Sequence, residues 1–178
     1  MRHQLAREII RNLSRFSSQQ SGPTALLDLN DVIKEVVQLR QRDLDSARVT
    51  LDVQVSSHRK VYANFTELEQ VTLNFVINAQ QAIEGAQRVG RVLIRLLDVG
   101  KKVRLEVNDN GPGVKHEDEA KLFQPFFTTK PVGKGTGLGL SVSYGIIDSY
   151  GGTIGYRGND WNGAVFYFEL AAAETPED

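Results

Sequence analysis

Four glycines fall within nine residues at Gly133–Ser141 (GKGTGLGLS), and a helix-like run follows at once. Glycine lets the backbone approach another molecule closely, and a helix N-terminus presents free N–H groups and the positive end of a dipole. The stretch therefore indicates either a phosphate site or a mobile glycine loop. It is not a P-loop, because Lys134 is followed by Gly135, and its G-x-G-x-G occurs too late in the chain for a dinucleotide fingerprint. The rest of a phosphate site must come from elsewhere.

Two asparagines, Asn74 and Asn78, are four residues apart in NFTELEQVTLNFVINAQQAI and share one face of a predicted helix. Their neighbours are apolar, and buried carboxamides need polar partners. Either a neighbouring loop satisfies them at the rim of the core, or they belong to a site.

A carboxylate, Asp109, stands at the end of a predicted strand and precedes a Gly-Pro-Gly turn in VNDNGPGV. The stretch is either a simple turn or a holder for a carboxylate that accepts hydrogen bonds from an exocyclic amine. The segment 122–130 (LFQPFFTTK) then places three phenylalanines and a lysine in polar surroundings. The phenylalanines are suited to pin a loop onto the core. Lys130 is either a phosphate contact or a solvated surface lysine.

The elements that must position these groups follow from periodicity and turn residues. Residues 1–16 predict an amphipathic helix, and the polar stretch 17–24 predicts a linker, so we expect a domain boundary near residue 22. Asn30 is expected to cap the next helix. Asn64 and Glu67 have the spacing of a capping box at the start of the long helix.

The predicted helices cover residues 30–46, 64–84 and 137–150, and the predicted strands cover residues 49–55, 60–63, 91–99, 102–109, 153–157 and 164–170. The third and fourth strands form a hairpin around Gly100. Residues 114–134 show little periodicity. This pattern predicts an α+β fold: a two-layer α/β sandwich with a mixed sheet and helices on one face, preceded by a helical stub. The domains expected are the stub and linker (1–22), the main domain (23–171) and a disordered tail (172–178).

Composition excludes several classes of function. The 178 residues contain no cysteine, which excludes disulfides and thiolate chemistry, and the net charge of −1 argues against a general nucleic-acid surface. No apolar run approaches the roughly 18 residues of a membrane span, and no signal peptide is visible. We expect a soluble, cytoplasmic domain, which is compatible with its being a piece of a larger membrane protein.

Together, the ordered motifs N-x-x-x-N-A, D-x-G-x-G, L-F-x-P-F-F-T-T-K and G-x-G-L-G-L resemble the catalytic ATP-binding domain of two-component sensor histidine kinases. That domain belongs to the superfamily shared with gyrase, the MutL repair ATPases and a heat-shock chaperone ATPase. The resemblance covers residues 26–170 and is strongest to the nitrogen-regulation and oxygen-sensing branch. It implies a Bergerat-type fold. The helix at residues 1–16 resembles the end of the second helix of the dimerisation and histidine-phosphotransfer hairpin.

The resemblance implies ATP and Mg²⁺ as cofactors. Asn78 matches the asparagine that binds magnesium, and its amide oxygen suits a hard cation. Asn74 matches the polar position one turn earlier, near the phosphates. Asp109 matches the acid that accepts the adenine amino group. Gly111 and Gly113 match the glycines that let the base approach the backbone.

Lys130 matches a phosphate contact of the loop that closes over the nucleotide. The catalytic residues that the resemblance implies are Asn74 and Lys130. The other nucleotide contacts implied are Gln81, Val114, Phe123, Thr129, Gly135, Thr136, Gly137, Leu138, Gly139, Leu140 and Ala164. The glycines at 135, 137 and 139 would then bring bare backbone N–H groups to the triphosphate.

Two positions depart from the family pattern. Many members have Gly-Thr before the last strand, where this chain has Gly163-Ala164, so a hydroxyl that helps to hold adenine is missing. Many also carry a basic residue and an aromatic residue after the second asparagine, where this chain has Gln81 and Ala82. Both changes are expected to loosen nucleotide binding without abolishing it.

None of the three histidines, His3, His58 and His116, resembles a phosphoacceptor. We therefore expect a kinase catalytic domain whose target histidine lies on a separate dimerisation segment, with a response regulator downstream. The parent kinase is expected to be a homodimer and this chain mostly a monomer, with no contact to nucleic acid or membrane. The alternatives are an ATP-hydrolysing conformational switch of the gyrase type and a nucleotide-binding module without chemistry. Asn74 separates the first two, because gyrase-type relatives have a glutamate base there.

Overall fold

The computed structural model describes residues 23–86, 88–125, 127 and 139–174. The elements are β1 (Ala25–Leu27), α2 (Leu29–Ser46), β2 (Val49–Val55), β3 (Val61–Ala63), α3 (Phe65–Ala86), β4 (Gly90–Val99), β5 (Lys102–Asp109), α4 (His116–Glu119), α5 (Gly139–Ser149), β6 (Thr153–Gly158) and β7 (Ala164–Ala171). The predicted helix at residues 1–16 and the boundary near residue 22 lie outside the described residues.

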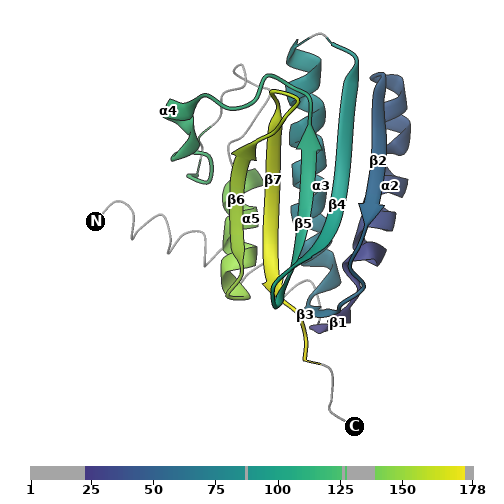
Figure 1. Cartoon of the computed structure of the whole chain (residues 1–178), viewed down its shortest axis with the longest axis vertical. Helices are drawn as coiled ribbons and strands as arrows, with labels where there is room; N and C mark the ends of the chain where they lie inside the picture. Colours follow the sequence, from purple (N-terminus) through teal and green to yellow (C-terminus); the bar gives the residue numbers. More distant parts are fainter. Residues whose placement is uncertain (1–22, 87, 126, 128–138, 175–178) are drawn as a thin grey trace.

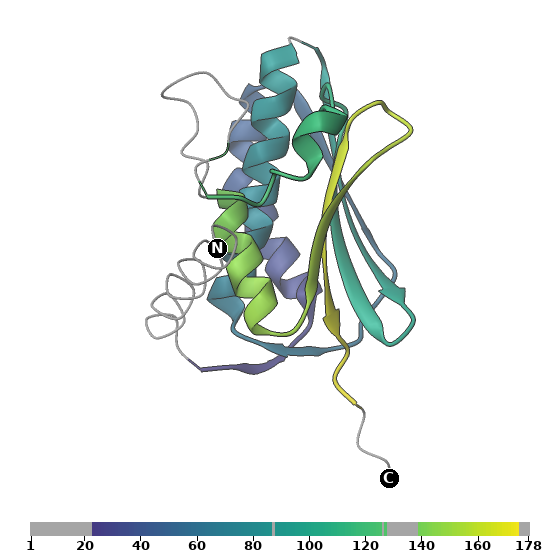
Figure 2. The ribbon, with the colours of Figure 1, turned by 90° about the vertical axis from the view of Figure 1, so that its left-hand side faces the viewer.

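One mixed sheet of five strands forms the main layer, in the order β2-β4-β5-β7-β6. β2 and β4 run parallel, and each of the other neighbouring pairs runs antiparallel. The helices α2, α3 and α5 lie side by side on one face of this sheet, as the two views in Figures 1 and 2 show. The predicted α+β sandwich with a mixed sheet and helices on one face is therefore confirmed.

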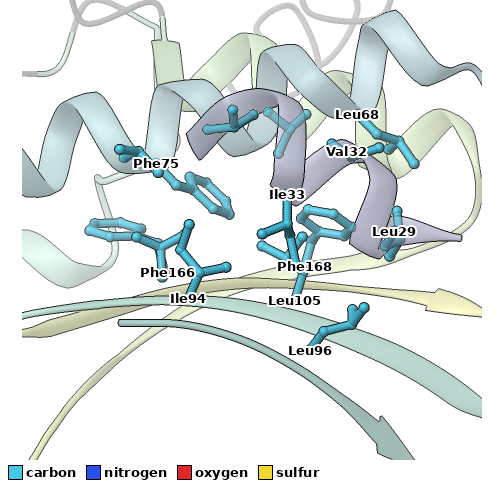
Figure 3. Packing of buried hydrophobic residues seen from close by; sticks show 14 of the residues in the cluster. Leu29, Val32, Ile33, Leu68, Phe75, Ile94, Leu96, Leu105, Phe166 and Phe168 are labelled. Atoms are coloured by element: carbon cyan, nitrogen blue, oxygen red, sulfur yellow. The ribbon is translucent and has the colours of Figure 1, made fainter. Parts of the chain in front are cut away.

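The hydrophobic core fills the space between the helices and the sheet (Figure 3). Phe75 of α3 is completely buried, and its ring centroid lies 5.8 Å from that of Phe166 and 6.3 Å from that of Phe168, both on β7. Leu105 of β5 and Ile33 of α2 pack into the same cluster. Because α3 is anchored by such contacts, the polar residues on its next turns are held at a set height above the sheet.

The start of α2 differs from the prediction. Asp28, not Asn30, is the N-cap, and its Oδ1 accepts a hydrogen bond from the backbone N–H of Asn30 at 2.9 Å. Both residue types are good caps. The helix begins earlier because Leu29 then enters the core, where it is completely buried. At α3 the predicted cap is confirmed, since Asn64 Oδ1 accepts from the backbone N–H of Glu67 at 3.0 Å.

Two short elements were missed in the sequence. β1 pairs antiparallel with β3 in a separate two-stranded sheet, and its three residues are too few to show a period. α4 lies within residues 114–134, for which no regular element was expected. The predicted hairpin of β4 and β5 is confirmed, with Val99 opposite Lys102.

The end of the described chain remains attached to the domain. The backbone N–H of Ala172 donates to Lys101 O at 3.0 Å, and that of Ala173 donates to Lys60 O at 2.7 Å. The ordered body therefore continues past the predicted boundary at residue 171. Residues 175–178 of the predicted tail lie outside the described part. Among the helices described, none has the length and hydropathy needed to cross a membrane.

Candidate functional site

Asp109 ends β5 on the helix-covered face of the sheet and is only 1% exposed. Its Oδ1 accepts hydrogen bonds from the backbone N–H groups of Gly111 at 2.9 Å and Ala164 at 3.3 Å. Its Oδ2 has no hydrogen-bond partner among the described residues. Burial raises the pKa of Asp109 to about 6, against the two backbone hydrogen bonds, which lower it. At neutral pH the carboxylate is therefore mostly ionised, and its Oδ2 is available to accept a hydrogen bond from a ligand.

Two glycines allow the backbone to close around this carboxylate. A Cβ at Gly111 would lie 3.1 Å from the Cβ of Ala82, on the last turns of α3. A Cβ at Gly163 would overlap the carbonyl oxygen of Asp109. The end of β5, the C-terminal part of α3 and the loop before β7 therefore converge on Asp109. The ends of β5 and α3 and the start of β7 lie at the upper end of the domain in Figure 1.

The asparagine pair lies on the same helix, α3. Asn74 Nδ2 donates to Gly139 O at 3.2 Å and contacts Ser143 Oγ at 3.3 Å, so it joins α3 to the first turn of α5. Asn78 is half-buried one turn further along α3. Gln81 follows, and its Oε1 is a buried acceptor without a hydrogen-bond partner in the described part of the chain. The turns of α3 that approach Asp109 thus present amide groups.

The segment after β5 is held by aromatic contacts, as predicted, through Phe123 and Phe127, whereas Phe126 lies outside the described residues. Phe123 is half-buried, with its ring centroid 6.3 Å from Tyr144 of α5 and 6.5 Å from Phe166, edge-on to the latter. Phe127 also packs against the core. The backbone N–H of Val114 donates to the hydroxyl of Tyr156 at 3.2 Å.

Some of the remaining predicted site residues lie within the described part of the structure, and the others lie outside it. Gly113 follows the turn after β5 with a φ of +76°, and Leu140 packs partly against the core from the first turn of α5. The structure thus brings Asp109, Gly111, Gly113 and Ala164 together around one carboxylate, and it places Asn74 at Gly139. Thr129, Lys130, Gly135, Thr136, Gly137 and Leu138 lie outside the described residues, so their roles stay predictions.

Sequence reasoning missed Asn159, which lies in the loop between β6 and β7. Its Nδ2 donates to Asp109 O at 2.9 Å, and its Oδ1 accepts from the backbone N–H of Gly163 at 2.9 Å. The stretch NDWNG marks a turn by composition. Nothing in that composition shows a partner 50 positions earlier in the chain.

The arrangement can hold an amine-bearing ring against Asp109 and a hard cation against the amide oxygens of α3. A carboxylate accepts hydrogen bonds from an exocyclic amine, and an amide oxygen is a ligand for Mg²⁺. No group of three or more histidine, cysteine, aspartate or glutamate side chains suited to a metal occurs in the described residues. A cation here would therefore depend on amide, water or phosphate oxygens.

Comparison with known proteins supports this interpretation. Residues 63–174, more than half of the chain, match the family model described as histidine kinase-, DNA gyrase B-, and HSP90-like ATPase. The sensor kinase CckA of Brucella abortus is 35% identical over 84% of this chain and 17% of its own length. The sensor histidine kinase ZraS of Escherichia coli K12 is 32% identical over 99% of this chain and 39% of its own. The chain thus spans well under half the length of these curated relatives.

Solved structures give the same result at the level of the domain. The catalytic domain of the histidine kinase ThkA superposes with a TM-score of 0.75 and 35% identity, over 85% of this chain and 97% of that one. ThkA in complex with the response regulator TrrA superposes with a TM-score of 0.68 and 27% identity, over 93% of this chain and 48% of that one. With Asp109, its glycines and the asparagines of α3 in place within the matched region, the chain belongs to the histidine kinase-, DNA gyrase B- and HSP90-like ATPase family.

Proposed function

We propose that this chain binds ATP and transfers its γ-phosphate to a histidine on a dimerisation segment, as the catalytic domain of a protein-histidine kinase. The observation that carries the proposal is the environment of Asp109. Its carboxylate is buried with no cation beside it among the described residues, is oriented through Oδ1 by two backbone N–H groups, and is able to accept through Oδ2. Adenine supplies the matching donor in its amino group, and guanine has a carbonyl at that position.

Two features of the site fit a nucleotide. Oδ2 of Asp109 and Oε1 of Gln81 are acceptors that no described residue satisfies. Buried polar atoms are nearly always paired, so the buried, unpaired Oε1 of Gln81 near the end of α3 favours a ligand that completes it. Both are acceptors, and the adenine amino group is a donor.

For the phosphates, Asn78 would contribute its side-chain oxygen to Mg²⁺, and Asn74 would lie one turn away. Magnesium supplies charge neutralisation for the β- and γ-phosphates during transfer. Lys130 and the glycines from Gly135 to Gly139 are proposed to complete the phosphate contacts. Asn74 already bonds to the carbonyl of Gly139, so α3 is attached to the residue where the glycine-rich segment enters α5.

The residue at position 74 favours phosphotransfer over hydrolysis. A general base on attacking water contributes typically about 10²–10⁴-fold, and a carboxamide cannot accept that proton. A neutral imidazole already has a lone pair, so a histidine nucleophile needs no such base. Among the described histidines, the His58 side chain is 71% exposed and that of His116 is 99% exposed, and each lies beside a carboxylate on the surface. We propose that neither is the acceptor.

The decisive experiment incubates the purified chain and Mg²⁺ with γ-labelled ATP, alone and with a separately purified dimerisation segment that carries the phosphoacceptor histidine. We expect no acid-labile phosphate on the chain itself and weak labelling of the segment. Asn78→Ala should abolish that labelling. Rapid phosphate release without any acceptor, abolished by Asn78→Ala, would instead establish an ATP-hydrolysing switch.

The proposed partners follow from the same chemistry. The phosphohistidine would pass its phosphate to a response regulator, by analogy with the complex of ThkA and TrrA. Because ATP is the substrate, we place the domain in the cytoplasm. The parent kinase is proposed to be a homodimer through its dimerisation segment, and the isolated chain a monomer.

A further inference from the structure

The side chain of Asn159 makes four hydrogen bonds across the loop between β6 and β7. Its Oδ1 accepts from the backbone N–H groups of Trp161 at 3.1 Å and Gly163 at 2.9 Å. Its Nδ2 donates to Asp109 O at 2.9 Å and Ala164 O at 3.3 Å. One amide group therefore joins the end of β5, the start of β7 and the loop between β6 and β7.

This network determines where the backbone N–H of Ala164 points. That N–H donates to Asp109 Oδ1 at 3.3 Å, and it is one of two groups that orient the carboxylate. Asn159 binds the carbonyl oxygens of both Asp109 and Ala164, so it sets the distance between the two strands at this point. With alanine at 164, no side-chain hydroxyl is available to help, and the orientation depends on the backbone alone.

A second contact holds the same loop from another side. The guanidinium carbon of Arg91, on β4, lies 4.3 Å from the centroid of the Trp161 ring. Such a cation–π contact attracts the guanidinium to the face of the indole ring and so holds the loop near β4. Trp161 is the single tryptophan of the chain, so its fluorescence reports on this loop alone.

We propose that Asn159 is a positioning residue for recognition of the base: it holds the loop between β6 and β7 against β5 so that Asp109 presents Oδ2 to an exocyclic amine. This inference rests on the proposed function, because it assumes that Asp109 reads adenine. It assigns a part of base selectivity to a side chain that acts through Asp109 and Ala164.

The test compares Asn159→Ala and Asn159→Asp with the wild-type chain. Affinity is measured by calorimetry for ATP and for inosine triphosphate, whose base has a carbonyl in place of the amine. The matched control is Asn108→Ala. Asn108 is a buried asparagine one residue before Asp109, whereas Asn159 is half-buried, and the Asn108 side chain bonds to Leu93 O at 3.3 Å and not to the loop.

We expect Asn159→Ala to lower the ratio of ATP affinity to inosine triphosphate affinity about tenfold, the size of one hydrogen bond to a charged group. The emission of Trp161 should shift to the red, because the loop leaves Arg91. Asn159→Asp keeps the acceptor for Trp161 and Gly163 but places an oxygen against the carbonyls of Asp109 and Ala164. It should lower the ratio to a similar extent, and it provides the measurement if Asn159→Ala does not fold. Asn108→Ala should change neither the ratio nor the emission.

An equal loss of affinity for both nucleotides in the Asn159 variants would overturn the positioning role and indicate a general structural one. An unchanged ratio, or an unchanged Trp161 emission in Asn159→Ala, would also overturn it. If the wild-type chain binds both nucleotides equally, the adenine assignment of Asp109 fails first, and the role of Asn159 fails with it.

Discussion

Two carboxylates on β5, Glu106 and Asp109, are three residues apart and each is 1% exposed, yet the protein treats them differently. Glu106 lies between the core residues Leu105 and Val107 on β5, so its side chain points to the opposite face of the sheet. The helices leave that face uncovered (Figure 2). Arg157 donates to its two oxygens at 2.9 and 3.1 Å, Arg95 lies at 3.4 Å and Arg104 at 3.6 Å. Three guanidinium groups therefore balance one carboxylate.

The arginines of this cluster are shared with a second acid. Arg104 donates to Glu169 on the neighbouring strand β7, and its guanidinium carbon lies 4.7 Å from the ring centroid of Tyr167. Burial lowers the pKa of Arg104, but the hydrogen bond and ion pair with Glu169, together with Glu106, outweigh this and raise it. Each of the two carboxylates in this cluster, Glu106 and Glu169, is therefore paired with at least one guanidinium group.

Asp109 has the opposite environment. No charged side chain in the described part of the chain contributes to its pKa, and its only compensation comes from two backbone N–H groups. A buried charge without a partner destabilises a fold, so such a group is kept where a ligand completes it. This difference is the basis for our proposal that Glu106 stabilises the sheet and that Asp109 serves binding.

The largest effect is expected at the paired carboxylate. Glu106→Ala removes this acceptor from Arg95 and Arg157, while Arg104 keeps Glu169, and removing one partner of a buried pair costs about 3–5 kcal/mol. Because the side chains of Arg95 and Arg157 are 38% and 49% exposed, water recovers part of this, and we expect a loss of about 3 kcal/mol. Urea unfolding measures it. The preference for ATP over inosine triphosphate should not change. A loss of this preference would contradict the assignment of a structural role to Glu106 and a binding role to Asp109.

Removing the unpaired charge should instead stabilise the nucleotide-free protein. The pKa of Asp109 rises from 3.8 to about 6 on folding, so the native state holds a proton between these values. The protonated Asp109 carboxyl therefore contributes a stability that is fully present below pH 3.8 and is lost as the pH rises through about 6. Asp109→Asn avoids this loss and should be more stable than wild type by about 2–3 kcal/mol at neutral pH, from about 1.4 kcal/mol per pKa unit.

That difference should vanish at acid pH. Urea unfolding of both proteins at pH 7.5 and pH 4 checks it, since near pH 4 the wild-type carboxyl is already neutral in the folded state. An Asp109→Asn variant less stable than wild type at pH 7.5 would show that the carboxylate contributes to the fold, as Glu106 does.

The same substitution should weaken nucleotide binding. Asp109→Asn should lower ATP affinity by about 10- to 100-fold, because a hydrogen bond to a charged group is worth about 1.5–3 kcal/mol. Affinity for GTP should be low in the wild type. Calorimetry with both nucleotides measures this, and equal affinities for ATP and GTP in the wild type would remove Asp109 from base recognition.

The smallest effect is expected for Asn74, and it tests whether the side chain at this position acts as a general base on water. Asn74→Ala loses the contacts to Gly139 O and Ser143 Oγ and should cost about 1 kcal/mol of stability. Slow ATP hydrolysis by the isolated chain should not fall through loss of a base. Steady-state phosphate release gives the rate. Fast wild-type turnover that drops by orders of magnitude in Asn74→Ala would show that water is activated there.

The sequence was sufficient for the long helices and for the five strands of the main sheet, but not for the short elements β1 and α4. The apolar period of α3, the capping pair at Asn64 and the alternation in β4 and β5 are local patterns, and each predicts its element. The order of the motifs predicts, through the family resemblance, that Asp109 and Asn78 belong to one nucleotide site. The core phenylalanine Phe123 could also be predicted, since an aromatic residue in a polar segment is seldom left in water.

Only the tertiary structure decided which buried carboxylates are paired with a charged side chain and which are not. On an alternating strand, Glu106 reads as a solvent-facing residue, and its burial results from arginines on β4, β5 and β6. Asn159 reads as a turn residue, and its bond to Asp109 joins positions 50 apart in the chain. Local patterns reflect the conformation of neighbouring residues, whereas these contacts depend on strand order and register, which form only when the whole sheet assembles.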